Sequence, residues 1–163
     1  MEKNIVVSER NEAAMAYFRQ GYNCCQSVIL AFCDIITEET GMSKEAMLNM
    51  SATFGGGIGG MREVCGTVSA IAMIVGLLSP SKNPDNPPEK EEKMQKYNQV
   101  KELANKFRDE NGSIICRDLL MMIVQQKENQ KSSEEQRTPR IRSCEQYVGD
   151  STKIIAEYIA ETL

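Results

Sequence analysis

Histidine and tryptophan are both absent from this chain of 163 residues. Without histidine the chain cannot build a Ser-His-Asp or Cys-His nucleophilic system, a mixed Cys/His zinc site, or the C-x-x-C-H attachment of haem. Without tryptophan, a stacking platform for single-stranded nucleic acid would depend on five tyrosines and four phenylalanines. The chemistry of the chain is therefore left to sulfur, carboxylate and backbone groups.

The chain also lacks a basic excess and a long apolar segment. Its 19 Lys and Arg residues are outnumbered by 23 Asp and Glu residues, which gives a net charge of −4 at pH 7 and argues against nucleic acid as a partner. The longest apolar run, Val68 to Leu78, is about half of the roughly 20 residues that span a bilayer. The N-terminus lacks the pattern of a secretory signal. We therefore predict a cytoplasmic protein with neither nucleic acid nor a membrane as its partner.

The hydrophobic pattern predicts helices and no strands. A chain of this length with 41% hydrophobic residues can bury a core without disulfides or metals. It contains no hairpin signal and no internal repeat. The predicted fold is all-α: one domain over residues 1–163, a bundle of about six helices, with a Gly-rich loop before a buried central helix.

Capping residues and helix breakers place the ends of these helices. The predicted helices run from a Ser8 cap to about Gln20, from an Asn23 cap through Ile35, from Lys44 to about Thr53, from Met61 to Leu78, from Glu89 to Asn111, from a Ser113 cap over IICRDLLMMIVQQ, and from a Ser143 cap to about Thr162. Two connectors, Ser79 to Pro88 and Lys127 to Arg142, are predicted between them.

A run of glycines from Gly55 to Gly60 precedes the central apolar helix. The run matches G-x-G-x-x-G, but no strand precedes it and no βαβ pattern surrounds it, so the sequence does not support a dinucleotide site. We expect instead a loop whose bare backbone closely approaches a packed helix, a ligand or the cysteine sulfurs.

Four of the six cysteines fall within the first turn or so of a different predicted helix. They are Cys24, Cys65, Cys116 and Cys144. A helix N-terminus offers unpaired N–H groups and the positive end of the helix dipole, which together lower a thiol pKa from roughly 8.5 to between 3.5 and 7.5. We therefore predict four thiolates at helix N-termini, near one another and near the glycine-rich loop. The alternative is that they are small hydrophobes that fill the core.

The spacing of the cysteines leaves their chemistry open, because no C-x-x-C pair occurs. One hypothesis is a thiol oxidoreductase or redox carrier, in which Cys24 and Cys65 cycle between dithiol and disulfide and Cys144 resolves or relays. A second is a metal- or iron–sulfur-binding protein with four thiolate ligands. A third is a helical interaction module with inert cysteines. Cys25 and Cys33 are predicted only to pack.

Five segments together resemble one known family. GYNCCQSV, the glycine-rich FGGGIGG, VCGTVSAIAMIVGL, SIICRDLL and SCEQYV occur in an order that is similar to the C_GCAxxG_C_C family of putative redox-active proteins. The resemblance implies that Cys24, Cys65, Cys116 and Cys144 are the four characteristic cysteines of that family. Around Cys65 the chain reads CGTVSA and so departs from the motif in the family's name.

What the resemblance implies is redox chemistry, with the reaction and substrate left unassigned. An iron–sulfur cluster or a metal ion is the candidate cofactor. The partner is left open between a redox partner and a small molecule, and a homo-oligomer is compatible with the sequence.

Overall fold

The computed structural model describes residues 5–131 and 143–163. Its elements are the α-helices α1 (Val7–Arg19), α2 (Cys24–Leu30), α3 (Cys33–Thr40), α4 (Lys44–Ser51), α5 (Gly66–Leu78), α6 (Lys90–Asn111), α7 (Cys116–Lys131) and α8 (Cys144–Thr162), with a 3₁₀ turn η1 (Ala52–Phe54). The prediction of an all-α fold is confirmed. The number is corrected, since the described residues form eight α-helices where about six were expected.

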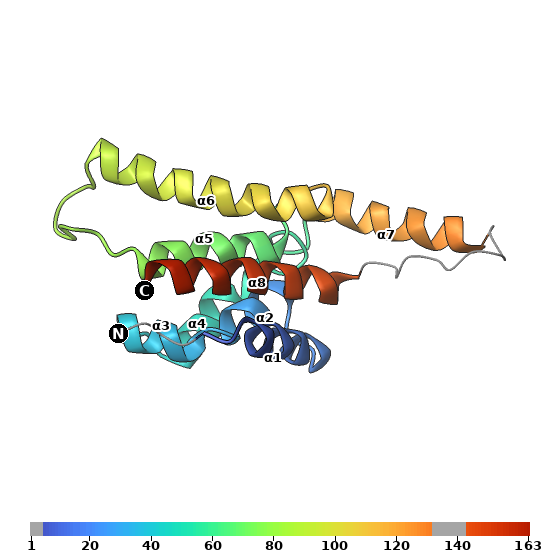
Figure 1. Ribbon diagram of the computed structural model, residues 1–163, viewed down its shortest axis with the longest axis horizontal. Helices are drawn as coiled ribbons and strands as arrows, with labels where there is room; N and C mark the ends of the chain where they lie inside the picture. The colour runs from blue at the N-terminus through green and yellow to red at the C-terminus, as the bar shows by residue number, and fades with distance from the viewer. Residues whose placement is uncertain (1–4, 132–142) are drawn as a thin grey trace.

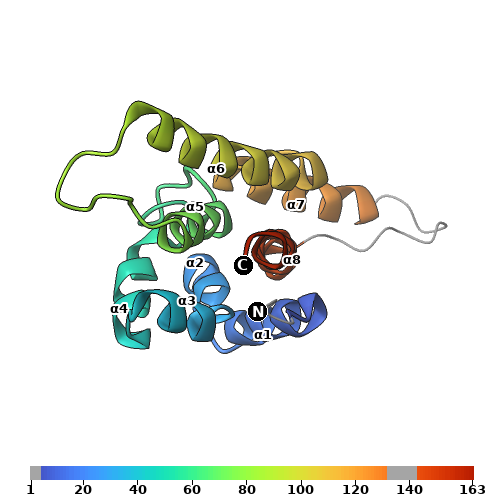
Figure 2. The ribbon, with the colours of Figure 1, turned by 60° about the vertical axis from the view of Figure 1, so that its left-hand side comes forward.

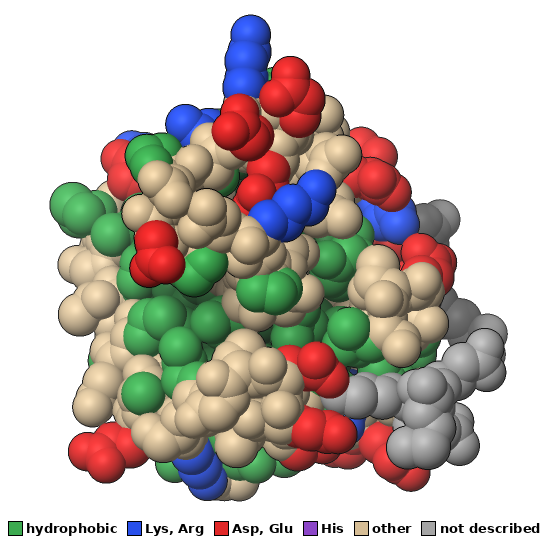
Figure 3. Space-filling model, turned by 90° about the vertical axis from the view of Figure 1, so that its left-hand side faces the viewer, with side chains coloured by type: hydrophobic (Ala, Val, Ile, Leu, Met, Phe, Trp, Pro, Cys, Tyr) green, Lys and Arg blue, Asp and Glu red, His purple; other side chains and the backbone are tan. Residues whose placement is uncertain are grey.

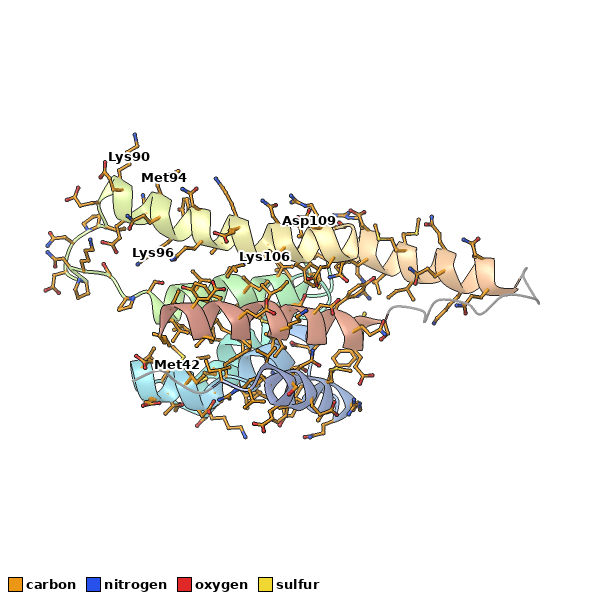
Figure 4. All side chains as sticks on the ribbon, viewed as in Figure 1. Met42, Lys90, Met94, Lys96, Lys106 and Asp109 are labelled. Atoms are coloured by element: carbon orange, nitrogen blue, oxygen red, sulfur yellow. The ribbon has the colours of Figure 1, made fainter. Side chains whose placement is uncertain are left out.

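The helices lie in three layers (Figures 1 and 2). The middle layer contains α5 and α8, with α1 to α4 on one side and α6 on the other. Figure 4 shows Lys90 and Met94 on the outer side of α6, whereas Leu103, Ala104 and Phe107 of the same helix are buried. Such an apolar stripe on a charged helix is typical of a helix that covers a core.

The middle layer explains the apolar run in the sequence. Of the central helix α5, seven residues are buried, from Gly66 at its start to Val75 in its last turn. A helix that is apolar nearly all round is buried on most sides, and α5 packs against α2, α3, α6 and α8. The predicted buried central helix is therefore confirmed. None of the helices in the described ranges combines the length and the apolar character needed to cross a membrane.

The predicted second helix is two helices, because the chain bends at Ala31 and Phe32. Phe32 has φ −119° and ψ 13° and its side chain is fully buried. The guanidinium of Arg10 donates a hydrogen bond of 2.8 Å to the oxygen of Ala31 and forms an ion pair of 2.6 Å with Asp34. A carbonyl freed by a helix break needs such a donor, so the tertiary contact with α1 supports the break.

Three helices begin two to five residues away from their predicted starts. The first helix begins at Val7, ahead of Ser8, with Val6 as its N-cap and without a side-chain cap bond. Ile5 and Val7 pack against the core, and this contact fixes the start of the helix. The central helix begins at Gly66 instead of Met61, and α7 begins at Cys116, because the residues before these two starts pair with each other. The helix α7 continues to Lys131 through part of the predicted connector, and the remainder of that connector, 132–142, lies outside the described residues.

The two ends of the molecule differ. Figure 3 shows the end that carries the connector between α5 and α6, where apolar side chains reach the surface between charged ones. The helices α5, α7 and α8 begin away from this end, toward the opposite side (Figure 1). The predicted site cysteines lie at these helix starts and at the start of α2.

Candidate functional site

Four cysteines from four segments line one small cavity. Its volume is about 20 Å³, and its walls are formed by Cys24, Cys65, Cys116 and Cys144 together with Gly66, Leu119, Leu120 and Tyr147. A cavity of this size holds about one water molecule. The structure therefore brings together all four cysteines that the sequence singled out, and their position at helix N-terminal ends is confirmed.

Two of the four cysteines are positioned by local capping boxes. Cys24 is the first residue of α2, where the Asn23 side chain accepts a hydrogen bond of 2.8 Å from the Gln26 backbone. Cys144 is the first residue of α8, where Ser143 and Gln146 form the same reciprocal pair. A capping box fixes the direction in which a chain enters its helix, so the side chain of the first residue is directed by the sequence around it.

The other two cysteines are positioned by a contact between distant segments. Val64 and Ile115 form an antiparallel bridge, in which the backbone N–H of Cys65 donates to the oxygen of Ile114 at 2.8 Å and that of Cys116 donates to the oxygen of Glu63 at 2.6 Å. This pairing draws the residues before Gly66 out of the predicted helix. As a result Cys65 is the N-cap of α5 and Cys116 is the first residue of α7.

The glycine-rich loop turns in the left-handed region beside these cysteines. Five consecutive residues, Gly56 to Gly60, have φ between 55° and 74°, and Ile58 is the one non-glycine among them. A Cβ added at Gly57 would lie 2.7 Å from the Cβ of Cys116, and one added at Gly66 would lie 3.2 Å from the Cβ of Cys24. Only glycine allows so close an approach. The expectation that the bare backbone approaches the cysteines is confirmed.

Burial makes the thiols of Cys24 and Cys65 weaker acids. It is the largest cause that raises the pKa of Cys24, to about 12, and the neighbouring charges that would form on Cys65, Cys144 and Cys116 raise it further. Burial likewise raises the pKa of Cys65, against the hydroxyl of Thr67 at 3.1 Å, which favours the thiolate. The prediction of lowered pKa values is therefore wrong for Cys24 and Cys65, because desolvation of a thiolate outweighs the helix N-terminus.

Cys144 differs from these two in having a cation nearby. Burial and possible charges on Cys65 and Cys116 raise its pKa, so the predicted lowering is wrong here as well, but the charge of Arg62 acts in the opposite direction. Cys24 and Cys144 are half-buried, whereas Cys65 and Cys116 are 5% and 9% exposed. A reagent from outside therefore meets Cys24 and Cys144 first.

The two remaining cysteines lie outside the cavity, as the sequence predicted. Cys25 is fully buried, and its sulfur lies 3.7 Å from the sulfur of Met73. Cys33 is half-buried beside Arg10 and Asp34 on the far side of α2 and α3. All six cysteines are free thiols. Within residues 5–131 and 143–163, no group of three or more Cys, Asp or Glu side chains is arranged to hold a metal ion.

Several residues of the site were not found from the sequence. Thr67 lies two residues beyond Cys65, and its hydroxyl contacts the sulfur of Cys65. A hydroxyl two residues from a cysteine is visible in the sequence, so this contact could have been predicted. Tyr147 forms part of the cavity wall, and its hydroxyl donates to the oxygen of Leu119 at 3.4 Å. Nothing local in the sequence shows which wall a core residue such as Tyr147 forms.

The raised pKa values make the stability of the reduced protein depend on pH. Cys24 and Cys25 have folded pKa values of about 12 against an ordinary value of 9.0. Above pH 9 the unfolded chain releases these protons and the folded protein keeps them, so this stabilisation is complete below pH 9 and is lost between pH 9 and 12. We expect each thiol to contribute a loss of about 1 kcal/mol in the free energy of unfolding between pH 8 and 10.

Urea unfolding of the reduced protein at pH 8 and pH 10 measures this loss. Cys25→Ala should remove about 1 kcal/mol of the difference between the two pH values. Val28→Ala, which truncates a fully buried, non-titrating residue of the same helix, should lower stability equally at both. A difference that is the same in Cys25→Ala as in the unchanged protein would contradict the assignment.

Comparison with known protein families gives a match over most of the chain. A family model described as "Putative redox-active protein (C_GCAxxG_C_C)" matches residues 22–158, a span that contains all four cavity cysteines. No curated protein matches the chain, and no solved structure does.

Proposed function

Because the chain belongs to the C_GCAxxG_C_C family of putative redox-active proteins, we propose that it is a thiol-based redox protein whose four cavity cysteines exchange electrons with a partner disulfide. The observation that carries the proposal is the convergence of four free thiols from four segments on one cavity of about 20 Å³. A core that only needed small apolar residues would not require sulfur at each of these positions.

Thiol–disulfide exchange balances without a metal or an added cofactor. A thiolate of the protein attacks one sulfur of the partner disulfide, forms a mixed disulfide, and releases the first partner thiol. A second protein thiolate attacks the protein sulfur of the mixed disulfide and releases the second partner thiol. In total, two protein thiols become one disulfide, and their two protons and two electrons convert the partner disulfide into two thiols.

The contacts favour Cys24 and Cys65 as the pair that ends as a disulfide. The Cβ of Cys24 lies against Gly66, the residue after Cys65. Among the neighbouring charges, that of Cys65 has the largest effect on the pKa of Cys24, while the charge of Cys116 acts on the pKa of Cys65. Disulfide formation requires such proximity of the two side chains.

Cys144 is suited to meet the partner. It is half-buried, whereas Cys65 is almost fully enclosed. Its thiolate attacks the partner, and Cys65 then attacks Cys144 and releases the partner thiol. Exchange with Cys24 moves the disulfide to the Cys24–Cys65 pair and regenerates the Cys144 thiol. Each step is an exchange of one sulfur for another, so the relay needs no further oxidant.

Oxidised glutathione tests the proposal. Anaerobically purified, reduced protein is treated with it, and the disulfides are mapped by mass spectrometry of non-reduced peptides. We expect bonds confined to the four cavity cysteines, reversible with dithiothreitol. Cys65→Ser should abolish the Cys24–Cys65 bond and accumulate glutathione on Cys144, and Cys33→Ser, which changes a cysteine outside the cavity, should leave the map unchanged.

Two outcomes would overturn the proposal. If the four cavity thiols remain reduced in the folded protein, they do not serve exchange. If the purified protein carries a stoichiometric metal and visible charge-transfer bands, the four sulfurs serve as ligands instead. Metal analysis and an ultraviolet–visible spectrum of the same anaerobic sample distinguish the two cases.

A further inference from the structure

Arg62 lies against the sulfurs of the site. Its Nη1 atom is 3.9 Å from the sulfur of Cys116. Burial and the charges of Cys65 and Cys116 raise the pKa of Cys144, and the charge of Arg62 offsets part of that rise. A guanidinium is charged at every accessible pH and donates to anions from a rigid fork. The contact therefore places a permanent positive charge beside Cys116, which lines the cavity, while Arg62 itself is exposed at the surface.

The backbone at Arg62 is held in an unusual conformation to make this contact. Its φ is 62°, in the left-handed region that L residues rarely adopt. The N–H of Arg62 donates to the oxygen of Gly56 at 2.9 Å, and the side chain passes so close to this glycine that an added Cβ would lie 3.3 Å from Nη1. Strain of this kind persists where the surrounding structure holds a residue in place, and it is frequent at functional sites.

Other charges near these two sulfurs are already paired. Next to Cys116 on its own helix, Arg117 forms an ion pair of 2.5 Å with Glu63. Next to Cys144 on its helix, Glu145 forms an ion pair of 2.5 Å with Arg19. Among the described residues, the other cavity cysteines also face these sulfurs: Cys24 from α2, Cys65 from the start of α5, and Cys116 and Cys144 toward each other. Tyr147 of α8 lines the same cavity and donates its hydroxyl to the oxygen of Leu119, and Asp118 of α7 accepts a hydrogen bond from the hydroxyl of Ser113.

We infer that Arg62 selects which thiol of the site becomes the nucleophile, by stabilising a thiolate on the side of Cys116 and Cys144 in preference to Cys24 and Cys65. The inference rests on the proposed thiol exchange and adds its regulation. In a close group of four thiols the first thiolate repels any second negative charge, so a single cation determines where the first charge forms. With Arg62 beside Cys116, that charge forms next to the half-buried Cys144, which is the thiol that a partner can reach.

The test is site-resolved alkylation as a function of pH. Reduced protein is pulsed with iodoacetamide from pH 6 to 10, and the label on each cysteine is quantified by mass spectrometry. Arg62→Gln should move the midpoints of Cys116 and Cys144 to higher pH and slow their labelling at pH 7.5 about three- to tenfold. Arg62→Lys keeps the charge and should restore part of the rate.

Two further variants separate charge from structure. Arg62→Gly also removes the charge but readily adopts a positive φ, so it should fold at least as well as the unchanged protein and shift both midpoints in the same direction. Arg108→Gln, which removes a guanidinium that donates to Asn105 on the outer helix α6, should shift neither midpoint. Labelling of Cys33 provides an internal reference in every variant.

The outcomes distinguish this inference from the proposed function. If both Arg62→Gln and Arg62→Gly leave the two midpoints in place while oxidised glutathione still forms the site disulfides, the inference is overturned and the exchange function stands. If the midpoints shift but the unchanged protein forms no site disulfides, Arg62 acts on the thiolates as inferred and the exchange function is overturned.

Discussion

Gly57→Ala is expected to lower the free energy of unfolding by about 3–5 kcal/mol. Gly57 has φ +72°, and a Cβ at this position would lie 2.6 Å from the nitrogen of Glu63 and 2.7 Å from the Cβ of Cys116. Neither neighbour is the flexible end of a long side chain, so the loop or the start of α7 must move. The conformational cost of a left-handed alanine adds to that of the steric overlap. Urea unfolding of the reduced protein measures the loss.

Gly59→Ala is the matched control for this variant. Gly59 lies in the same loop with φ +55°, but a Cβ added there meets no atom within 4 Å. Only the conformational cost applies, and we expect a loss of about 1 kcal/mol. Equal losses in the two variants would show that backbone conformation alone, and not contact with Cys116, requires glycine in this loop.

The same comparison bears on the chemistry of the site. Displacement of Cys116 in the Gly57 variant should disturb the alkylation profile of that thiol at pH values where the protein remains folded. Gly59→Ala should leave the profile unchanged. Identical labelling of Cys116 in both variants would show that the cavity geometry is unchanged. The glycine-rich loop would then serve the fold and not the sulfurs.

The parts of the site that follow local rules were predictable from the sequence. Asn23 with Gln26 and Ser143 with Gln146 form the capping boxes that their spacing indicates, and these fix Cys24 and Cys144 at the first positions of their helices. Side-chain caps act within three residues, so the sequence contains all the information that such a helix start needs.

The positions of Cys65 and Cys116 could be predicted only approximately. The apolar pattern from Met61 favours a helix, yet residues 62–65 leave the helical path to pair with 114–117. That pairing joins segments about fifty residues apart, and no periodicity within either segment specifies it. Tertiary contacts override local propensity in such cases. The contact between Arg62 and Cys116 depends on the same pairing and was hidden for the same reason.

The acidity of the thiols shows the limit of a local argument most clearly. A helix N-terminus is a property of a few residues, and it correctly indicates a preference for negative charge. Desolvation depends on how completely other segments cover the sulfur, and for Cys24 it dominates and raises the pKa to about 12. The sequence therefore predicts that a helix N-terminus lowers the pKa of a thiol, but it does not show how far desolvation raises that pKa.

Phe107→Ala is expected to lower the free energy of unfolding by about 3–5 kcal/mol. Phe107 is fully buried on the inner side of α6, and its ring meets that of Tyr147 edge-on, with centroids 6.1 Å apart and an interplanar angle of 61°. Truncation removes both the buried area and the aromatic contact, and the surrounding helices cannot fully close the space.

Tyr97→Ala is the matched control. It removes an aromatic ring from the same helix at a position that is 55% exposed, and it should lower the free energy of unfolding by less than about 0.5 kcal/mol.

The Phe107 variant should also change the site, because Tyr147 is shared between the two. The ring of Tyr147 rests against Phe107 on one side and forms part of the wall of the cysteine cavity on the other. Loss of its support should let the wall relax into the space left by the phenyl ring, and the enclosed thiol of Cys65 should then be alkylated several-fold faster in the folded protein. Alkylation at pH 8, quenched at a series of times, measures the labelling rate of Cys65 in Phe107→Ala and Tyr97→Ala. Equal labelling rates of Cys65 in the two variants would show that the Phe107 ring does not support the cavity wall.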